Sequence, residues 1–140
     1  MSQERETTVL VIDDCEAKRD LASHILRKAG FRVYAAEFGQ EGLEISRQCD
    51  PDMILLDFQL PDIDGAAVLK GLRREPATKD VHVASISVSS SLVEEVDYRS
   101  VGYDSRFDMT KIRELPSFIE ATLERRGTDA DPLEAVWDRR

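Results

Sequence analysis

Two short apolar runs that lead into aspartates decide the fold of this chain: VLVIDD at residues 9–14 and MILLD at residues 53–57. Consecutive apolar residues rich in Val, Ile and Leu are typical of a strand buried on both faces of a parallel sheet. The carboxyl ends of such strands meet at one edge of the sheet, where open α/β folds place their ligands. We therefore expect Asp13, Asp14 and Asp57 to converge at that edge.

Three carboxylates gathered at one edge would repel one another. At about 4 Å and an effective dielectric of about 20, each pair of like charges costs roughly 4 kcal/mol. Protonation or a bound cation would relieve this repulsion, and carboxylate oxygens in a hydrated cluster are ligands that Mg²⁺ prefers. The sequence therefore predicts a divalent cation, Mg²⁺, beside an aspartate.

The formal net charge of −9 over 140 residues argues against a nucleic-acid backbone or an anionic membrane as the main partner, because both attract clustered Lys and Arg. The length suits one domain with a hydrophobic core. No apolar stretch approaches the roughly 20 residues of a transmembrane helix, and the polar N-terminus does not look like a signal peptide. Cys15 and Cys49 have no metal-ligand spacing. We therefore expect a cytoplasmic protein with free thiols.

Strand and helix patterns alternate along the chain. Strands are expected over residues 8–13, 32–36, 52–57 and 81–88 and within 103–111, and helices over 14–30, 39–49, 65–74, 92–100 and 116–126. Asp14 is the expected N-cap of the first helix, Gly30 its C-terminal residue, and Gly127 the residue that stops the last helix. Five βα units predict a doubly wound, five-stranded parallel sheet with helices on both faces. The folded domain is expected over 8–126, followed by an acidic tail over 127–140 that is either disordered or docked.

Three motifs follow one another at successive strand ends. They are VIDD at residues 11–14, ILLDFQLPDIDG at residues 54–65, and Ser87 at the end of the fourth predicted strand. In these motifs, over about residues 8–126, the chain resembles the receiver domain of two-component response regulators. The resemblance implies a flavodoxin-like sheet with strand order 2-1-3-4-5 and a phosphorylation-dependent signalling switch, here of the single-domain type.

The resemblance also implies a role for each site residue. Asp57 would accept a phosphoryl group from a phosphohistidine on a sensor histidine kinase or phosphotransfer protein. Asp13, Asp14 and Asp57 would hold Mg²⁺ together with the backbone carbonyl of Gln59, and the metal would offset charge repulsion during transfer. Ser87 would then hydrogen-bond a phosphoryl oxygen. The domain would catalyse only its own phosphorylation and dephosphorylation, and would not be an enzyme acting on other substrates.

The lysine-proline pair that ends the fifth strand in this family does not occur after Ser87. We favour Lys111 as the lysine, since it keeps the last helix in register, although it requires about two extra residues. Arg106 is the alternative; it requires a shortening, and a planar guanidinium does not replace an ammonium. Counting without a gap lands on Met109, which can make no ionic contact. Val88 stands where the family usually has a small residue.

These departures keep an alternative function open: a receiver-like protein-interaction module with impaired or absent phosphorylation switching. Two other classes fit the residues less well. Phosphatases and mutases that form an aspartyl phosphate carry a second acid where this chain has Gln59. The first turn, residues 13–16, is acidic and lacks glycine, so it would repel the pyrophosphate of a nucleotide.

The expected output is contact with a downstream target protein through the surface formed by residues 90–126. We expect no contact with nucleic acid or membrane, and either a monomer or a dimer linked to phosphorylation.

Overall fold

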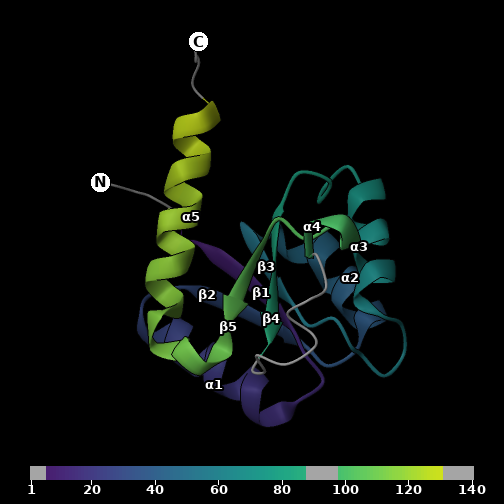
Figure 1. Cartoon of the computed structure of the whole chain (residues 1–140), viewed down its shortest axis with the longest axis horizontal. Helices are drawn as coiled ribbons and strands as arrows, with labels where there is room; N and C mark the ends of the chain where they lie inside the picture. The colour runs from purple at the N-terminus through teal and green to yellow at the C-terminus, as the bar shows by residue number, and fades with distance from the viewer. Residues whose placement is uncertain (1–5, 88–97, 131–140) are drawn as a thin grey trace.

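The computed structural model describes residues 6–87 and 98–130, in which five parallel strands form one sheet in the order β2-β1-β3-β4-β5 (Figure 1). The strands are β1 Thr8–Ile12, β2 Arg32–Ala36, β3 Met53–Leu56, β4 His82–Ser87 and β5 Ser105–Asp108. The helices are α1 Glu16–Lys28, α2 Gly39–Cys49, α3 Gly65–Arg74, α4 Tyr98–Val101, the 3₁₀ helix η2 Met109–Glu114, and α5 Leu115–Ala130. The predicted fold class and strand order are confirmed.

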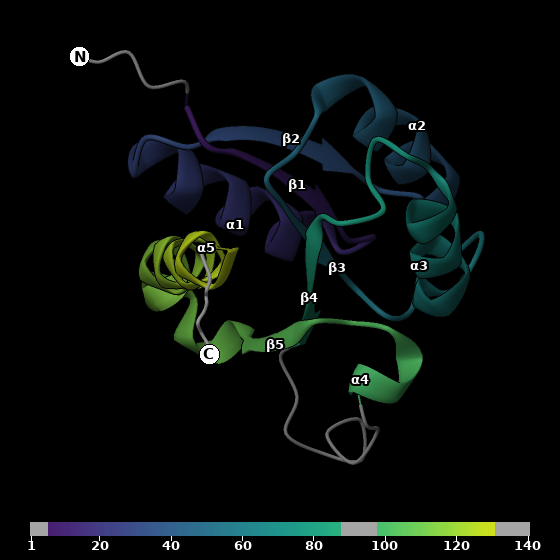
Figure 2. The same cartoon turned by 90° about the horizontal axis from the view of Figure 1, so that it is seen from above.

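Successive residues of the central strands face opposite sides of the sheet, as the strand period of two requires. Val9 and Val11 belong to a core cluster with side chains of α1 and α5. Leu10 and Ile12 belong to a second cluster with side chains of α3. Figure 2 shows α1 and α5 on one side of the sheet and α2 and α3 on the other. Both faces of the sheet are therefore covered by helices.

Of three predicted helix boundaries, one agrees with the structure and two differ from it. Asp14 is not the N-cap of α1, because the cap position is Cys15 and makes no side-chain hydrogen bond to the helix. Gly30 has a φ of +99°, as a residue ending a helix in the left-handed region does. Gly127 does not stop α5, which continues to Ala130. An isolated glycine weakens a helix by about 1 kcal/mol relative to alanine but keeps its N–H donor, so the helix can pass through it.

Some predictions fall wholly or partly outside the described residues. Val88 and most of the helix predicted over 92–100 lie there, and α4 is the described part of that region. Residues 131–140 of the predicted tail also lie there, whereas 127–130 continue α5. Within 6–87 and 98–130, no helix combines the length and the apolar character that crossing a lipid bilayer requires.

Candidate functional site

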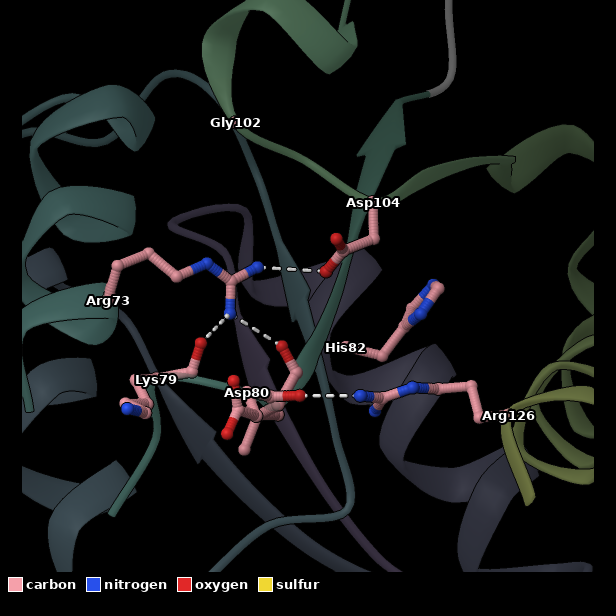
Figure 3. Close-up of a pocket in the computed structure, with 8 residues that line it drawn as sticks. Arg73, Lys79, Asp80, His82, Gly102, Asp104 and Arg126 are labelled. Atoms are coloured by element: carbon pink, nitrogen blue, oxygen red, sulfur yellow. Dashed lines mark hydrogen bonds and ion pairs between the residues drawn. The ribbon is translucent and has the colours of Figure 1, made fainter. Parts of the chain in front are cut away.

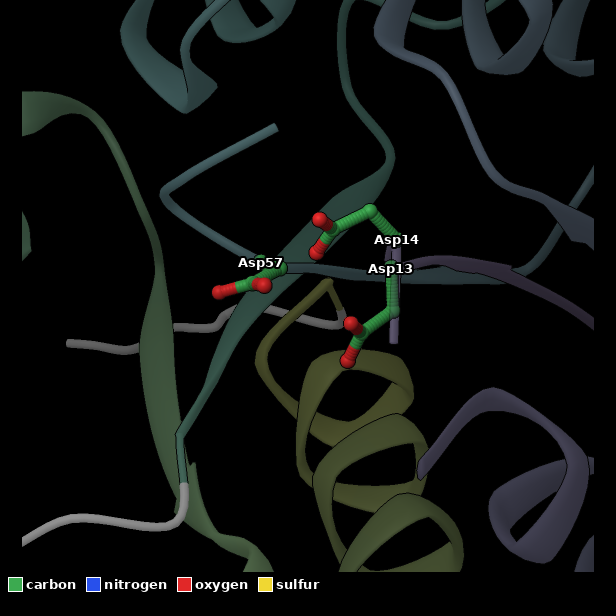
Figure 4. Close-up of side chains that lie close together, drawn as sticks. All are labelled: Asp13, Asp14 and Asp57. Carbon is green, nitrogen blue, oxygen red and sulfur yellow. The ribbon is translucent and has the colours of Figure 1, made fainter. Parts of the chain in front are cut away.

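Asp13, Asp14 and Asp57 meet at the carboxyl ends of β1 and β3, two strands that are neighbours in the sheet (Figure 4). The backbone N–H of Asp57 donates to the Ile12 carbonyl at 3.0 Å, which fixes the end of β3 beside the end of β1. One carboxylate oxygen from each aspartate lies within 4.8 Å of the others. The convergence expected from the two apolar runs is therefore present.

The carboxylate of Asp13 is completely buried and only partly satisfied. Its Oδ1 accepts a hydrogen bond from the backbone N–H of Cys15 at 2.9 Å. Its Oδ2 lies 3.0 Å from Nζ of Lys18 but has no hydrogen-bond partner among the described residues. The Lys18 contact is thus an ion pair without hydrogen-bond geometry. A buried carboxylate oxygen in this state is free to coordinate a cation.

Lys18 comes from the first turns of α1 and also reaches Asp57, with 3.8 Å between its Nζ and Asp57 Oδ2. Its side chain is only 14% exposed. Sequence reasoning missed this residue. The signal was present, because Lys18 stands four residues before buried Ala22 and therefore on the apolar face of the helix. A charged residue there needs a partner at the site that the helix covers.

The pKa of Asp57 is raised to about 6, mainly by burial and also by the negative charges of Asp13 and Asp14. The ammonium of Lys18 and a hydrogen bond from the backbone of Gln59 lower the pKa of Asp57. The raising effects outweigh the lowering ones, so Asp57 binds a proton more readily than a free aspartate does. Three carboxylates and one ammonium meet here, so the cluster carries a net negative charge when all of these groups are ionised.

These residues fit the Mg²⁺ that receiver domains bind at an acidic pocket. The donor set is three carboxylates, which are hard oxygen ligands. One of them presents a buried oxygen that accepts no hydrogen bond within residues 6–87 and 98–130. The carbonyl of Gln59 as a further ligand stays a prediction.

Ser87 and the candidate lysines lie around β5. Ser87 ends β4, is half-buried, and pairs with Asp108, the last residue of β5. The next residue, Met109, is buried in the core cluster that includes side chains of α1 and α5.

Lys111 is exposed within η2 and Arg106 is exposed on β5. Among the ion pairs of the described residues, Asp57 has one with Lys18 and none with these two cations. The role predicted for Lys111 stays a prediction.

The space beside the Asp57 loop is closed by Tyr103 and Gly65. A Cβ on Gly65 would lie 2.5 Å from the Tyr103 hydroxyl and 3.0 Å from Cα of Phe58, so glycine is required for space. The Tyr103 hydroxyl is buried and has no hydrogen-bond partner among the described residues. Burial raises the pKa of Tyr103, and the charges of Asp57 and Asp64 raise it further, so the hydroxyl stays protonated.

A second group of charges lines a pocket at the amino end of β4, away from the acid cluster (Figure 3). Arg73 donates to the carbonyls of Lys79 and Val81 and pairs with Asp104 at 2.8 Å. Arg126 donates to the carbonyl of Asp80. These contacts tie α3 and α5 to the segments that lead into β4 and β5, which indicates a structural role.

Residues 9–107 match the family described as the response regulator receiver domain. The chain is 35% identical over 132 residues to the DNA-binding dual master transcriptional regulator RpaA of Synechocystis, a match covering 91% of this chain and 52% of RpaA. It is 26% identical over 113 residues to the polar-differentiation response regulator DivK of Brucella ovis, covering 81% of this chain and 90% of DivK. The chain spans about half the length of the first curated relatives that it matches.

Solved structures show the same fold. A putative response regulator from Chloroflexus aurantiacus has a TM-score of 0.77 and 25% identity, over 86% of this chain and 99% of that one. The chemotaxis response regulator CheY4 of Vibrio cholerae has a TM-score of 0.69 and 25% identity, over 86% of this chain and 98% of that one. With the matched sequence, the sheet order and the acid cluster in agreement, this chain belongs to the response regulator receiver family of two-component signalling.

Proposed function

We propose that this chain is a switch in which Asp57 accepts a phosphoryl group from a phosphohistidine, in a reaction that depends on Mg²⁺. The phosphodonor is a sensor histidine kinase or a phosphotransfer protein. The observation that carries the proposal is the position of Asp57, whose side chain is 19% exposed and lies within 4.8 Å of two further carboxylates. Asp57 is thus open to a donor while its neighbours can hold a cation.

The transfer forms one bond and breaks one. A carboxylate oxygen of Asp57 bonds to phosphorus, the N–P bond of the phosphohistidine breaks, and its electron pair returns to the imidazole nitrogen. Asp13 and Asp14 would hold Mg²⁺, which neutralises charge on the transferring phosphoryl group. Because the pKa of Asp57 is raised to about 6, mainly by burial, the free domain presents the nucleophilic carboxylate mainly above that pH. Ser87 would then donate its hydroxyl to a phosphoryl oxygen.

The output is contact with a target protein through the surface of residues 90–126. The described part of that surface consists of α4, β5, η2 and most of α5. Repacking of the half-buried end of β4 against β5 would carry the phosphorylation state to this surface, in the manner of a local charge change acting on a two-state element.

A phosphorylation assay tests the acceptor. We expect radiolabel from a small phosphodonor to enter the wild type in the presence of Mg²⁺ and to be lost in Asp57→Asn. Asp20→Asn is the matched control, because Asp20 is exposed on α1 and its replacement makes the same charge change. Label entering Asp57→Asn at the wild-type rate would place the acceptor elsewhere.

One observation favours the second candidate function, an interaction module with impaired switching. Met109, the residue after β5, is buried in the core and offers no charge to a phosphoryl group. Beryllofluoride with Mg²⁺, which mimics the aspartyl phosphate, separates the two. A switch requires that amide resonances over 98–115 shift together with those around Asp57, whereas shifts confined to the surroundings of Asp57 favour the interaction module.

A further inference from the structure

The ammonium of Lys18 is held inside the acid cluster. Its Nζ lies 3.0 Å from Asp13 Oδ2 and 3.8 Å from Asp57 Oδ2, and its side chain is 14% exposed. Burying an ammonium is unfavourable unless nearby charges compensate it. Here the compensation comes from the carboxylates that also form the predicted metal site.

The geometry of this contact leaves Lys18 able to move. Its approach to Asp13 Oδ2 is not that of a hydrogen bond, and its distance to Asp57 is beyond hydrogen-bond range. A lysine ammonium carries three donors on a flexible stem, so it can turn from one acceptor to another nearby without the helix moving. Lys18 therefore neutralises both acids without being locked to either of them.

In the described structure, the end of β5 supplies no comparable cation to Asp57. The pairing of Ser87 with Asp108 brings Met109 to the position after the strand, where its side chain is 5% exposed and packs in the core. Lys111 lies two residues further on, exposed in η2. Within the described part of the chain, Lys18 is the cation that forms an ion pair with Asp57.

We infer that Lys18, from α1, is the residue that binds the phosphoryl group once Asp57 carries it, in place of a lysine after β5. This inference rests on the proposed function. Before transfer, the ammonium offsets the repulsion among the three aspartates. With a divalent ion held by the aspartates, the ammonium would turn toward Asp57 and donate to a phosphoryl oxygen. Lys18 thus competes with the metal in the free domain and cooperates with it in the phosphorylated one.

These two roles predict opposite effects for one substitution. In Lys18→Met, Mg²⁺ should bind the free domain several-fold more tightly, because a competing positive charge is gone. Beryllofluoride at saturating Mg²⁺ should bind about tenfold or more weakly, because a hydrogen bond to a charged group contributes about 1.5–3 kcal/mol. Calorimetry measures the first dissociation constant, and ¹⁹F NMR measures the second.

Two variants serve as matched comparisons. Lys28→Met removes the same charge from the exposed end of α1 and should leave both dissociation constants unchanged. Lys111→Met should leave beryllofluoride affinity unchanged if Lys18 makes the contact. Lys18→Gln, which keeps polarity without charge, replaces Lys18→Met if the methionine variant unfolds, and an amide fingerprint spectrum checks the fold of each variant.

The inference is overturned if Lys18→Met binds beryllofluoride as tightly as the wild type or more tightly. Lys18 would then neutralise the aspartates only while no metal is bound. The inference is also overturned if Lys111→Met loses the affinity and Lys18→Met does not. Both results leave the proposed function intact. A wild type that binds no beryllofluoride at all would overturn the phosphorylation proposal and the inference together.

Discussion

The two ends of the sheet carry charge clusters that differ in how well they are satisfied. At the amino end of β4, the Arg73 guanidinium contacts two carbonyls and Asp104, and Asp104 also accepts from the backbone N–H of Val83 at 2.9 Å. At the carboxyl ends of β1 and β3, Asp13 Oδ2 is buried and has no hydrogen bond from any residue that the structure describes. Buried polar groups are normally paired, so an unpaired one needs an explanation. The hydrogen-bonded cluster around Arg73 stabilises the fold, whereas the acid cluster can still bind a ligand.

The largest effect on stability is expected from Asp57→Asn. The folded state raises the pKa of Asp57 from 3.8 to about 6, so it binds a proton more tightly than the unfolded chain does. Ionised Asp57 therefore lowers stability as pH rises from about 4 through 6. The variant should gain at most about 3 kcal/mol above pH 6 and nothing below pH 4. Urea unfolding of the metal-free domain across this pH range measures the gain.

Adding Mg²⁺ sharpens this prediction. The ion stabilises the folded wild type by mass action, so the advantage of Asp57→Asn at pH 7 should shrink as Mg²⁺ is titrated in. A gain of equal size at pH 4 and pH 7 would contradict the assignment of the penalty to the ionised carboxylate.

Arg73→Met should destabilise the domain by about 2 kcal/mol, because it removes charge-assisted hydrogen bonds and leaves Asp104 without its cation. The affinity for Mg²⁺ should not change, since Arg73 belongs to the cluster at the other end of the sheet. Arg74→Met is the control, because Arg74 is the exposed neighbour on the same helix. A weakened Mg²⁺ affinity in Arg73→Met would show that the two clusters are coupled.

Arg126→Met should have the smallest effect, about 1 kcal/mol, because it removes one hydrogen bond to the Asp80 carbonyl. The change should appear mainly as faster amide hydrogen exchange in the second half of α5. Exchange that accelerates equally in β1 would mean that this bond supports the whole domain and not the helix end.

The acid cluster could be predicted from the sequence because it depends on strand ends, which the apolar runs mark clearly. The bounds of β2 and α2 were also predictable, since Gly30, Gly39 and Asp50-Pro51 punctuate the chain there. These signals are local, so they survive without knowledge of the tertiary structure.

The sequence did not identify which Lys or Arg side chain lies at the acid cluster. The position of a lysine after β5 depends on where a gap is placed, and the 3₁₀ turn of η2 begins at that point. Lys18 was missed because periodicity shows which face of α1 is buried but not that its first turns lie over the strand ends. The end of α5 was predicted too early, at Gly127, because the sequence does not distinguish a glycine within a helix from one beyond its end.

The absence of any connecting residue between β5, η2 and α5 has a mechanical consequence. β5 ends at Asp108, η2 begins at Met109, and α5 begins at Leu115, while Met109 and Leu115 are anchored in one core cluster. Sixteen residues of helix span about 24 Å, so a tilt of about 5° at the base would sweep the far tip by about 2 Å. A small change at the strand end beside Ser87 would thus produce a larger displacement at the far end of α5.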